Sequence, residues 1–225
     1  MLQLFRNQSI NDFRIPHNPD EIRKRIKIVV IDDDEASFPT NLLSTSGYTI
    51  EWWDKVDDRN LERLEKNHFD IIILDINDIA APSISSTDGI GILERIKEVN
   101  PAQIVVAFSG QEFNIDKTHF FKKADDTLSK PVDFIKAKNL IDRIIDQKIT
   151  LIYFWSSLNG YLMKEGVKTK QIKRVEKELI SAIKNQRSVD YNLIGGKILK
   201  GVEISSKVIF LIKKFLSIVG FVAAA

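Results

Sequence analysis

The sequence predicts an α/β fold with a doubly wound, five-stranded parallel sheet, followed by an all-helical C-terminal domain. Three observations predict it: short apolar runs alternate with helical segments, these runs are apolar on both faces, and the alternation stops near residue 149. A strand that is apolar on both faces is typical of a parallel sheet covered by helices. Alternation at this spacing indicates βαβ units with right-handed crossovers.

The predicted elements follow one another at regular intervals along the first part of the chain. Strands are predicted over 28–31, 48–53, 71–74, 104–108 and 127–129. Helices are predicted over 38–46, 60–67 and 89–99, in a segment that reaches residue 123, and from residue 133 onward. Gly47 stands where a helix C-cap is expected, and Asn100-Pro101 ends the helix before it.

Three domains are expected. Residues 1–25 have mixed polarity and two prolines, which indicates an N-terminal extension, and residues 26–148 form the α/β domain. Residues 149–225 form the helical domain, in which 171–184 shows the apolar period of an amphipathic helix. The segment 201–221 is apolar around most of its circumference.

The composition restricts the chemistry and the compartment. An apolar fraction of 44% with 28% charged residues is typical of a folded chain. The chain has no cysteine, which excludes disulfides, zinc thiolate sites and thiol catalysis. It also lacks a signal-peptide core and any stretch of ~18 uncharged apolar residues. We therefore expect a cytoplasmic protein.

The net charge of +2 conceals two parts of opposite charge. Residues 146–225 carry 14 Lys and Arg against 6 Asp and Glu, a balance of +8. The remaining 19 basic and 25 acidic residues give residues 1–145 a balance of −6. This asymmetry indicates two units with different partners.

Polar residues follow four of the predicted strands at their carboxyl ends. Asp32-Asp33-Asp34 follows the first strand, Asp75 the third, Ser109 the fourth and Lys130 the fifth. Ligands and chemistry collect at this edge of a parallel sheet. Carboxylates, a hydroxyl and a lysine in one crevice suit a metal-assisted acceptor of a phosphoryl group.

These motifs resemble the receiver domain of two-component response regulators. The resemblance extends over residues 26–148 and depends on the order and spacing of several motifs. The motifs are the acidic pair Asp32-Asp33, the acceptor Asp75, Asp88-Gly89 before a helix, Ser109-Gly110, and Lys130-Pro131, whose peptide bond is cis in the family.

The resemblance implies a role for each of three residues. Asp75 is the nucleophile that accepts a phosphoryl group from a phosphohistidine on a histidine kinase or phosphotransfer protein. Lys130 pairs with one phosphoryl oxygen, and the Ser109 hydroxyl donates a hydrogen bond to another. Phosphoryl transfer of this kind depends mainly on positioning and on charge stabilisation.

A magnesium ion is implied by the same resemblance. Asp33 and Asp75 are the expected side-chain ligands, Asp32 acts through water, and Asn77 supplies its backbone carbonyl. Mg²⁺ suits such a site because it accepts a few carboxylates and phosphate oxygens while keeping several waters.

Two features depart from the family pattern. The loop between Asp75 and Gly89 is longer than is usual in the family. Thr127 stands where the family usually has a tyrosine or phenylalanine that turns inward when the hydroxyl at Ser109 moves toward the phosphoryl group. A movement of the Ser109 hydroxyl is compatible with this sequence. An inward turn of an aromatic side chain at position 127 is not, because that residue is threonine.

The C-terminal segment 149–225 resembles no output family. It contains no histidine, which excludes a phosphotransfer bundle. Its amphipathic periodicity favours a helical module for protein interaction or dimerisation. Its basic residues leave nucleic-acid binding open. A membrane-surface helix over 207–221 is less favoured than burial of that helix in a bundle.

We therefore predict a response regulator of a two-component phosphorelay. It is expected to be a signalling protein that catalyses only its own phosphorylation and dephosphorylation, and not otherwise an enzyme. The alternative for residues 26–148 is a pseudo-receiver that acts only by binding proteins.

Overall fold

The computed structural model describes residues 9–12, 19–110, 118–185, 187–200 and 206–220. Up to residue 146, the described residues from 19 onward pack as one compact unit, here called the α/β unit. Residues 9–12 pack with those from 147 onward in a second one, here called the helical unit. The domain limits at 25/26 and 148/149 stay predictions.

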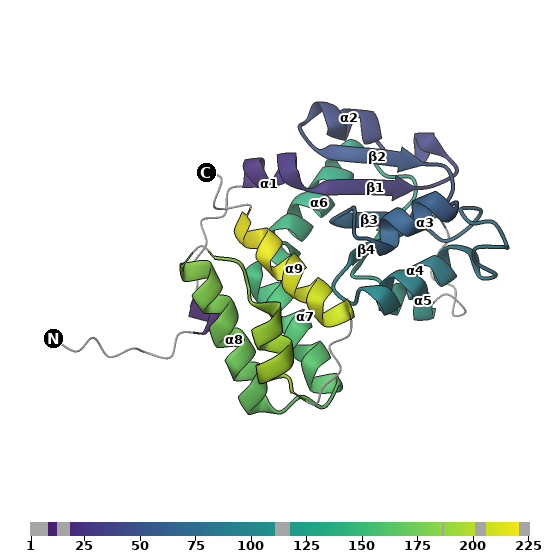
Figure 1. The fold of residues 1–225 in the computed structure, drawn as a ribbon. Helices are drawn as coiled ribbons and strands as arrows, with labels where there is room; N and C mark the ends of the chain where they lie inside the picture. Colours follow the sequence, from purple (N-terminus) through teal and green to yellow (C-terminus); the bar gives the residue numbers. More distant parts are fainter. Residues whose placement is uncertain (1–8, 13–18, 111–117, 186, 201–205, 221–225) are drawn as a thin grey trace. The chain divides into compact units, whose positions relative to one another are not determined.

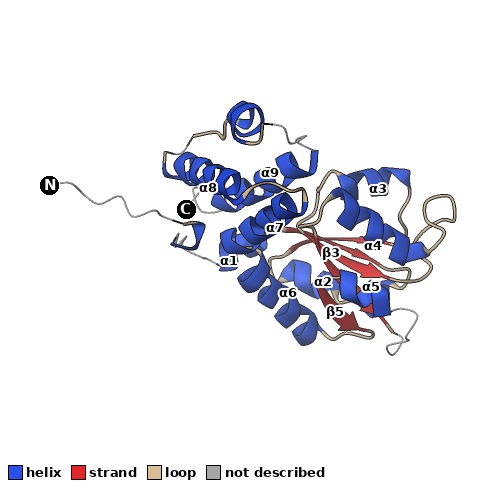
Figure 2. Cartoon of the chain, turned by 90° about the horizontal axis from the view of Figure 1, so that it is seen from below, coloured by secondary structure: helices blue, strands red, loops and turns tan. Residues whose placement is uncertain are grey.

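The α/β unit contains a five-stranded sheet in which every pair of neighbouring strands is parallel (Figures 1 and 2). The strands, in the order β2-β1-β3-β4-β5 across the sheet, are β2 (Thr49–Trp53), β1 (Lys27–Ile31), β3 (Ile71–Asp75), β4 (Ile104–Ser109) and β5 (Asp126–Ser129). The predicted doubly wound parallel sheet is confirmed. The inner strands β3 and β4 are buried at every residue, whereas the edge strands β2 and β5 are partly exposed.

A helix follows each of these strands at the predicted place. These helices are α2 (Thr40–Thr45), α3 (Asp58–Glu65), α4 (Asp88–Val99), α5 (Thr118–Lys123) and α6 (Phe134–Lys148). Gly47 follows α2 with a φ of 94°, as the predicted C-cap requires.

A further helix, α1 (Pro19–Arg25), lies within the segment that the sequence assigned to an extension. Its first turn is acidic and its last turn basic, a distribution that favours the helix dipole. Ile22 in this helix is buried, so α1 is part of the core of the α/β unit.

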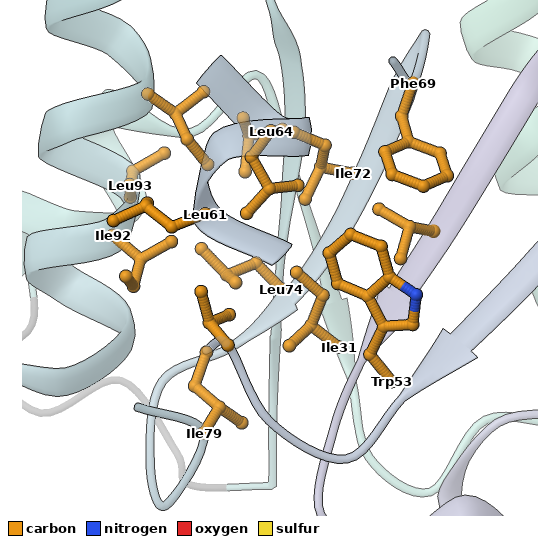
Figure 3. Close-up of a cluster of buried hydrophobic side chains, with 14 of the residues drawn as sticks. Ile31, Trp53, Leu61, Leu64, Phe69, Ile72, Leu74, Ile79, Ile92 and Leu93 are labelled. Carbon is orange, nitrogen blue, oxygen red and sulfur yellow. The ribbon is translucent and has the colours of Figure 1, made fainter. Parts of the chain in front are cut away.

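Apolar side chains fill one face of the sheet beneath α3 and α4 (Figure 3). Leu61 and Leu64 of α3 meet Ile72 and Leu74 of β3 in this cluster, and the Trp53 ring lies edge-on to Phe69 with 5.1 Å between centroids. Alternate residues of the same strands point to the opposite face and are also buried. This two-sided burial explains why the strands read as continuous apolar runs.

The helical unit consists of α7 (Leu151–Lys164), α8 (Thr169–Lys184), the π-helical turn η4 (Leu193–Ile198) and α9 (Ser206–Gly220). The predicted helical character of the C-terminal region is confirmed, and those parts of the predicted 201–221 segment that precede or follow α9 lie outside the described residues. Apolar residues recur at helical spacing and are buried, among them Phe154, Leu158 and Phe215. The buried Glu178 forms a two-point ion pair with Arg187.

A short segment from near the N-terminus completes the helical unit. Ile10 in the turn η1 (Ile10–Asp12) is fully buried. The Glu176 carboxylate of α8 accepts hydrogen bonds from the Ser9 hydroxyl and the Ile10 N–H, each at 3.0 Å. Residues that precede the sheet therefore pack with helices that follow it. None of the described helices has the length and apolar character needed to cross a bilayer.

Candidate functional site

Three carboxylates meet at the carboxyl edge of the sheet. Asp32 follows β1 and Asp75 ends β3, and these two strands are neighbours, so their ends place the two side chains together. One oxygen from each of Asp32, Asp33 and Asp75 lies within 4.8 Å of the other two. Asp32 and Asp75 are buried, whereas Asp33 is exposed. The structure thus brings together the acidic residues that the sequence selected.

Lys130 joins this cluster from the end of β5. Its Nζ lies 2.6 Å from Asp32 Oδ2 and 2.7 Å from Asp75 Oδ2. The same ammonium group lies 5.1 Å from the centroid of the Phe108 ring. The Lys130-Pro131 peptide bond is cis, as the resemblance implied.

Hydrogen bonds from neighbouring groups fix the two buried carboxylates. Asp32 Oδ1 accepts the Asp34 N–H at 2.9 Å, and its Oδ2 accepts the Ser37 hydroxyl at 2.8 Å. Asp75 Oδ1 accepts the N–H of Ile76 at 2.6 Å. The contact of Ser37 was not predicted, and its position five residues after Asp32 is the only sequence signal for it.

Burial and charge shift the proton affinities at the site. Burial raises the pKa of Asp75, although hydrogen bonds from Lys130 and from the Ile76 N–H oppose this rise. Burial by itself lowers the pKa of Lys130, but hydrogen bonds to Asp32 and Asp75 outweigh it, and the pKa of Lys130 is raised. Lys130 is therefore fully charged at neutral pH.

Ser109 ends β4, the strand next to β3, and is buried. Asp75 pairs in register with Phe108, which places Ser109 one residue beyond the acceptor on the neighbouring strand. The Ser109 carbonyl accepts the Lys130 N–H at 3.0 Å, which ties the ends of β4 and β5 together. Thr127 lies on the edge strand β5 and is exposed.

The start of α4 lies against the end of β3. A Cβ atom on Gly89 would stand 2.1 Å from the Asp75 carbonyl oxygen, so this position requires glycine. The Gly89 N–H donates to the Ile76 carbonyl at 3.0 Å. Asp88-Gly89 was recognised in the sequence only as a motif, and the contacts of the Asp88 side chain were not predicted. Its carboxylate accepts backbone N–H groups of the loop that follows Asp75.

The donor set fits a divalent cation that prefers oxygen ligands. Three ionised carboxylates and the ammonium of Lys130 leave the cluster with an excess of two negative charges. Oxygen donors at this spacing are typical of Mg²⁺ sites. Because Lys130 neutralises only part of the charge, a cation would relieve the remaining repulsion.

Comparisons relate part of this chain to known proteins. The family model of the response regulator receiver domain matches residues 28–144. A CheY-like response regulator receiver domain protein from Methanospirillum hungatei JF-1 superposes with a TM-score of 0.46 at 22% identity, covering 55% of this chain and 95% of that one. A two-component response regulator from Clostridium difficile gives 0.45 at 20% identity over 55% of this chain and 98% of that one.

A third solved structure, the receiver domain of NtrX from Brucella abortus, gives a TM-score of 0.44 at 23% identity. That match covers 53% of this chain and 98% of the other. A comparison with curated proteins found no match.

Proposed function

This chain belongs to the response regulator receiver family, and on that premise we propose that Asp75 accepts a phosphoryl group from a histidine kinase or phosphotransfer protein. The observation that carries the proposal is the bridge of Lys130 between Asp32 and Asp75 inside the three-carboxylate cluster. A pseudo-receiver that only binds proteins has no need of this arrangement.

In the proposed reaction a carboxylate oxygen of Asp75 attacks the phosphorus atom of a phosphohistidine. The new oxygen–phosphorus bond forms an acyl phosphate as the nitrogen–phosphorus bond breaks, and the electron pair stays on the imidazole. Lys130 neutralises one phosphoryl oxygen, and the Ser109 hydroxyl donates to another. The Ile76 N–H holds the Asp75 carboxylate in place for the attack.

The residues proposed to hold Mg²⁺ are those predicted from the sequence. Asp33 and Asp75 bind through their side chains, Asp32 through water, and Asn77 through its backbone carbonyl. When bound, the ion supplies positive charge to the phosphoryl oxygens and relieves repulsion between the carboxylates.

The helical unit is proposed to pass the phosphorylation state on by binding a protein partner or a second copy. Supporting this, Ile152 and Met163 of α7 are 45% and 56% exposed and are separated by three helical turns, so they lie on one face. A change of oligomeric state on adding beryllofluoride, measured by light scattering, is the expected result. An unchanged monomer that also fails to bind a protein partner would contradict it.

A second candidate output is nucleic-acid binding. Basic side chains recur along the exposed side of α8, namely Lys170, Lys173, Arg174, Lys177 and Lys184. A mobility shift of duplex DNA that weakens with added salt would support this candidate. No shift at low salt would exclude it.

Phosphorylation itself is tested by labelling with acetyl phosphate. We expect Mg²⁺-dependent labelling of the wild type and none in Asp75→Asn, because an amide cannot form the acyl phosphate. Asp70→Asn is the matched control, since Asp70 precedes the same strand at its opposite end and accepts the Lys27 N–H. Labelling that persists in Asp75→Asn, or that is absent from the wild type, would refute the assignment.

A further inference from the structure

The Asp88 carboxylate binds three consecutive backbone N–H groups in the loop after the acceptor strand. Its Oδ2 accepts the N–H of Asp78. Its Oδ1 accepts the N–H of Ile79 at 3.1 Å and that of Ala80 at 2.8 Å. Hydrogen bonds to an ionised acceptor are stronger than those between neutral groups. Asp88 therefore holds this loop against the start of α4.

The loop is anchored on its other side as well. The Val56 N–H donates to the Ile79 carbonyl at 2.7 Å, and Val56 forms a parallel bridge with Ala80. Val56 and Ile79 are buried. Asp78, with a φ of 59°, lies in the left-handed region, which aspartate tolerates better than most residues. The backbone at residues 78–80 is thus held from two sides.

The bond from Asp78 to Asp88 has a consequence for Asn77. The Asp78 N–H and the Asn77 carbonyl belong to the same peptide group, and this peptide bond is trans. In a planar trans peptide the N–H and the C=O point in opposite directions. By binding the N–H, Asp88 directs the Asn77 carbonyl away from its own carboxylate. A negative acceptor on the N–H also polarises the carbonyl and makes its oxygen a better ligand.

The same frame carries the acceptor. Gly89, directly after Asp88, approaches the Asp75 carbonyl so closely that no side chain fits between them, and its N–H donates to Ile76. Asp88 is consequently tied to the backbone of the acceptor strand on one side and to the Asp78 N–H on the other.

We propose that Asp88 is a positioning residue that orients the Asn77 carbonyl toward the Mg²⁺ site. The inference depends on the proposed function, in which that carbonyl is a metal ligand. Such a role is compatible with the long loop, because Asp88 holds residues 78–80 in place whatever path the later loop residues take. Partners of metal ligands typically contribute about 10–100-fold to metal affinity.

Isothermal titration with Mg²⁺ alone tests the proposal on the whole 225-residue chain. We expect Asp88→Ala to weaken Mg²⁺ binding by about tenfold. Asp88→Asn separates orientation from folding, because the asparagine oxygen still accepts from Ile79 and Ala80 while its amide cannot accept from Asp78. We expect a weakened affinity in this variant with a melting temperature close to that of the wild type.

The matched control is Asp57→Asn. Asp57 caps α3 by accepting the Asn60 N–H at 2.7 Å, beside the same loop, and asparagine is an equally good cap. This substitution removes the same charge without touching the Asp88 bonds. An equal loss of Mg²⁺ affinity in Asp57→Asn would show a general charge effect and overturn the proposal.

A kinetic readout distinguishes positioning from a structural role. In acetyl phosphate labelling, we expect Asp88→Asn to raise the Mg²⁺ concentration for half-maximal rate by about tenfold while the rate at saturating Mg²⁺ stays unchanged. A lower maximal rate with unchanged half-saturation would overturn the proposal. Wild-type Mg²⁺ affinity in Asp88→Asn would overturn this inference alone, whereas no Mg²⁺ binding by the wild type would overturn the proposed function with it.

Discussion

The amino edge and the carboxyl edge of the sheet both bury polar side chains, but their charges are compensated to different extents. At the amino edge, the amides of Asn100 and Gln103 are buried and bond to each other, to Asn67 and to the Asp70 carbonyl. The ion pairs there, Lys97 with Asp125 and Arg143 with Asp126, each have one charge of each sign.

The carboxyl edge has three carboxylates, and the Lys130 ammonium contacts two of them, those of Asp32 and Asp75. Two of these carboxylates, Asp32 and Asp75, are buried, so the excess negative charge is costly there, and a cation would relieve it. Burial of polar groups therefore does not by itself identify a functional site. The uncompensated negative charge is what indicates a functional site, because a network that only stabilises the fold is expected to balance its charges.

The largest expected effect is on the labelling rate, which we expect to depend on Lys130 at the carboxyl edge and not on Lys97 at the amino edge. Lys130→Met should slow acetyl phosphate labelling of Asp75 by about 100-fold, because it removes the ammonium that stabilises the phosphoryl oxygens. Lys97→Met, the matched change at the amino edge, should label at the wild-type rate. Initial labelling rates at saturating Mg²⁺ measure both, and equal slowing of the two variants would contradict the distinction.

The next prediction concerns the free energy of unfolding, which we expect to depend strongly on Lys97. Lys97 Nζ bonds Asp125 Oδ2 and the Gln103 carbonyl, and Asp125 also accepts the Val105 N–H. Lys97→Met removes the ammonium that neutralises this largely buried carboxylate and should lower the free energy of unfolding by about 3 kcal/mol. Urea denaturation followed by tryptophan fluorescence measures the loss. A change below about 0.5 kcal/mol would show that the Lys97–Asp125 ion pair contributes no more than a solvent-exposed pair and would contradict the prediction.

The smallest effect concerns stability at the carboxyl edge. Burial raises the pKa of Asp75 in the folded chain, so the folded state holds this proton more tightly than the unfolded state. Ionised Asp75 therefore destabilises the fold, and this cost disappears as the pH falls through the folded pKa toward the ordinary value of about 4. Asp75→Asn should be modestly more stable than the wild type at pH 7 without Mg²⁺.

The pH dependence provides the check on this last prediction. The advantage of Asp75→Asn should shrink on acidification and vanish near pH 4, as measured by urea denaturation in EDTA. An advantage that grows as the pH falls would have the wrong sign and would contradict the raised pKa of Asp75.

Much of the candidate site was predictable because strand ends are visible in a sequence. Asp32, Asp75 and Lys130 each follow an apolar run, and parallel pairing delivers such ends to one edge. The contacts of Ser37 and Asp88 were not predictable, since they depend on the paths of loops. Likewise, helix α1 is short and lies beside prolines, so its few buried residues show no clear period.

The sequence by itself determined the alternation of buried strands and helices, and with it the parallel sheet and the acidic cluster around Asp75. The tertiary structure alone decided which backbone groups meet these side chains. It brought Ile10 into the helical unit and Asp88 onto the Asp78 N–H. The physical reason is the range of the interactions. Periodicity and strand ends are local properties of the sequence, whereas these contacts join residues that are separated along the chain, and no local pattern predicts which of them meet.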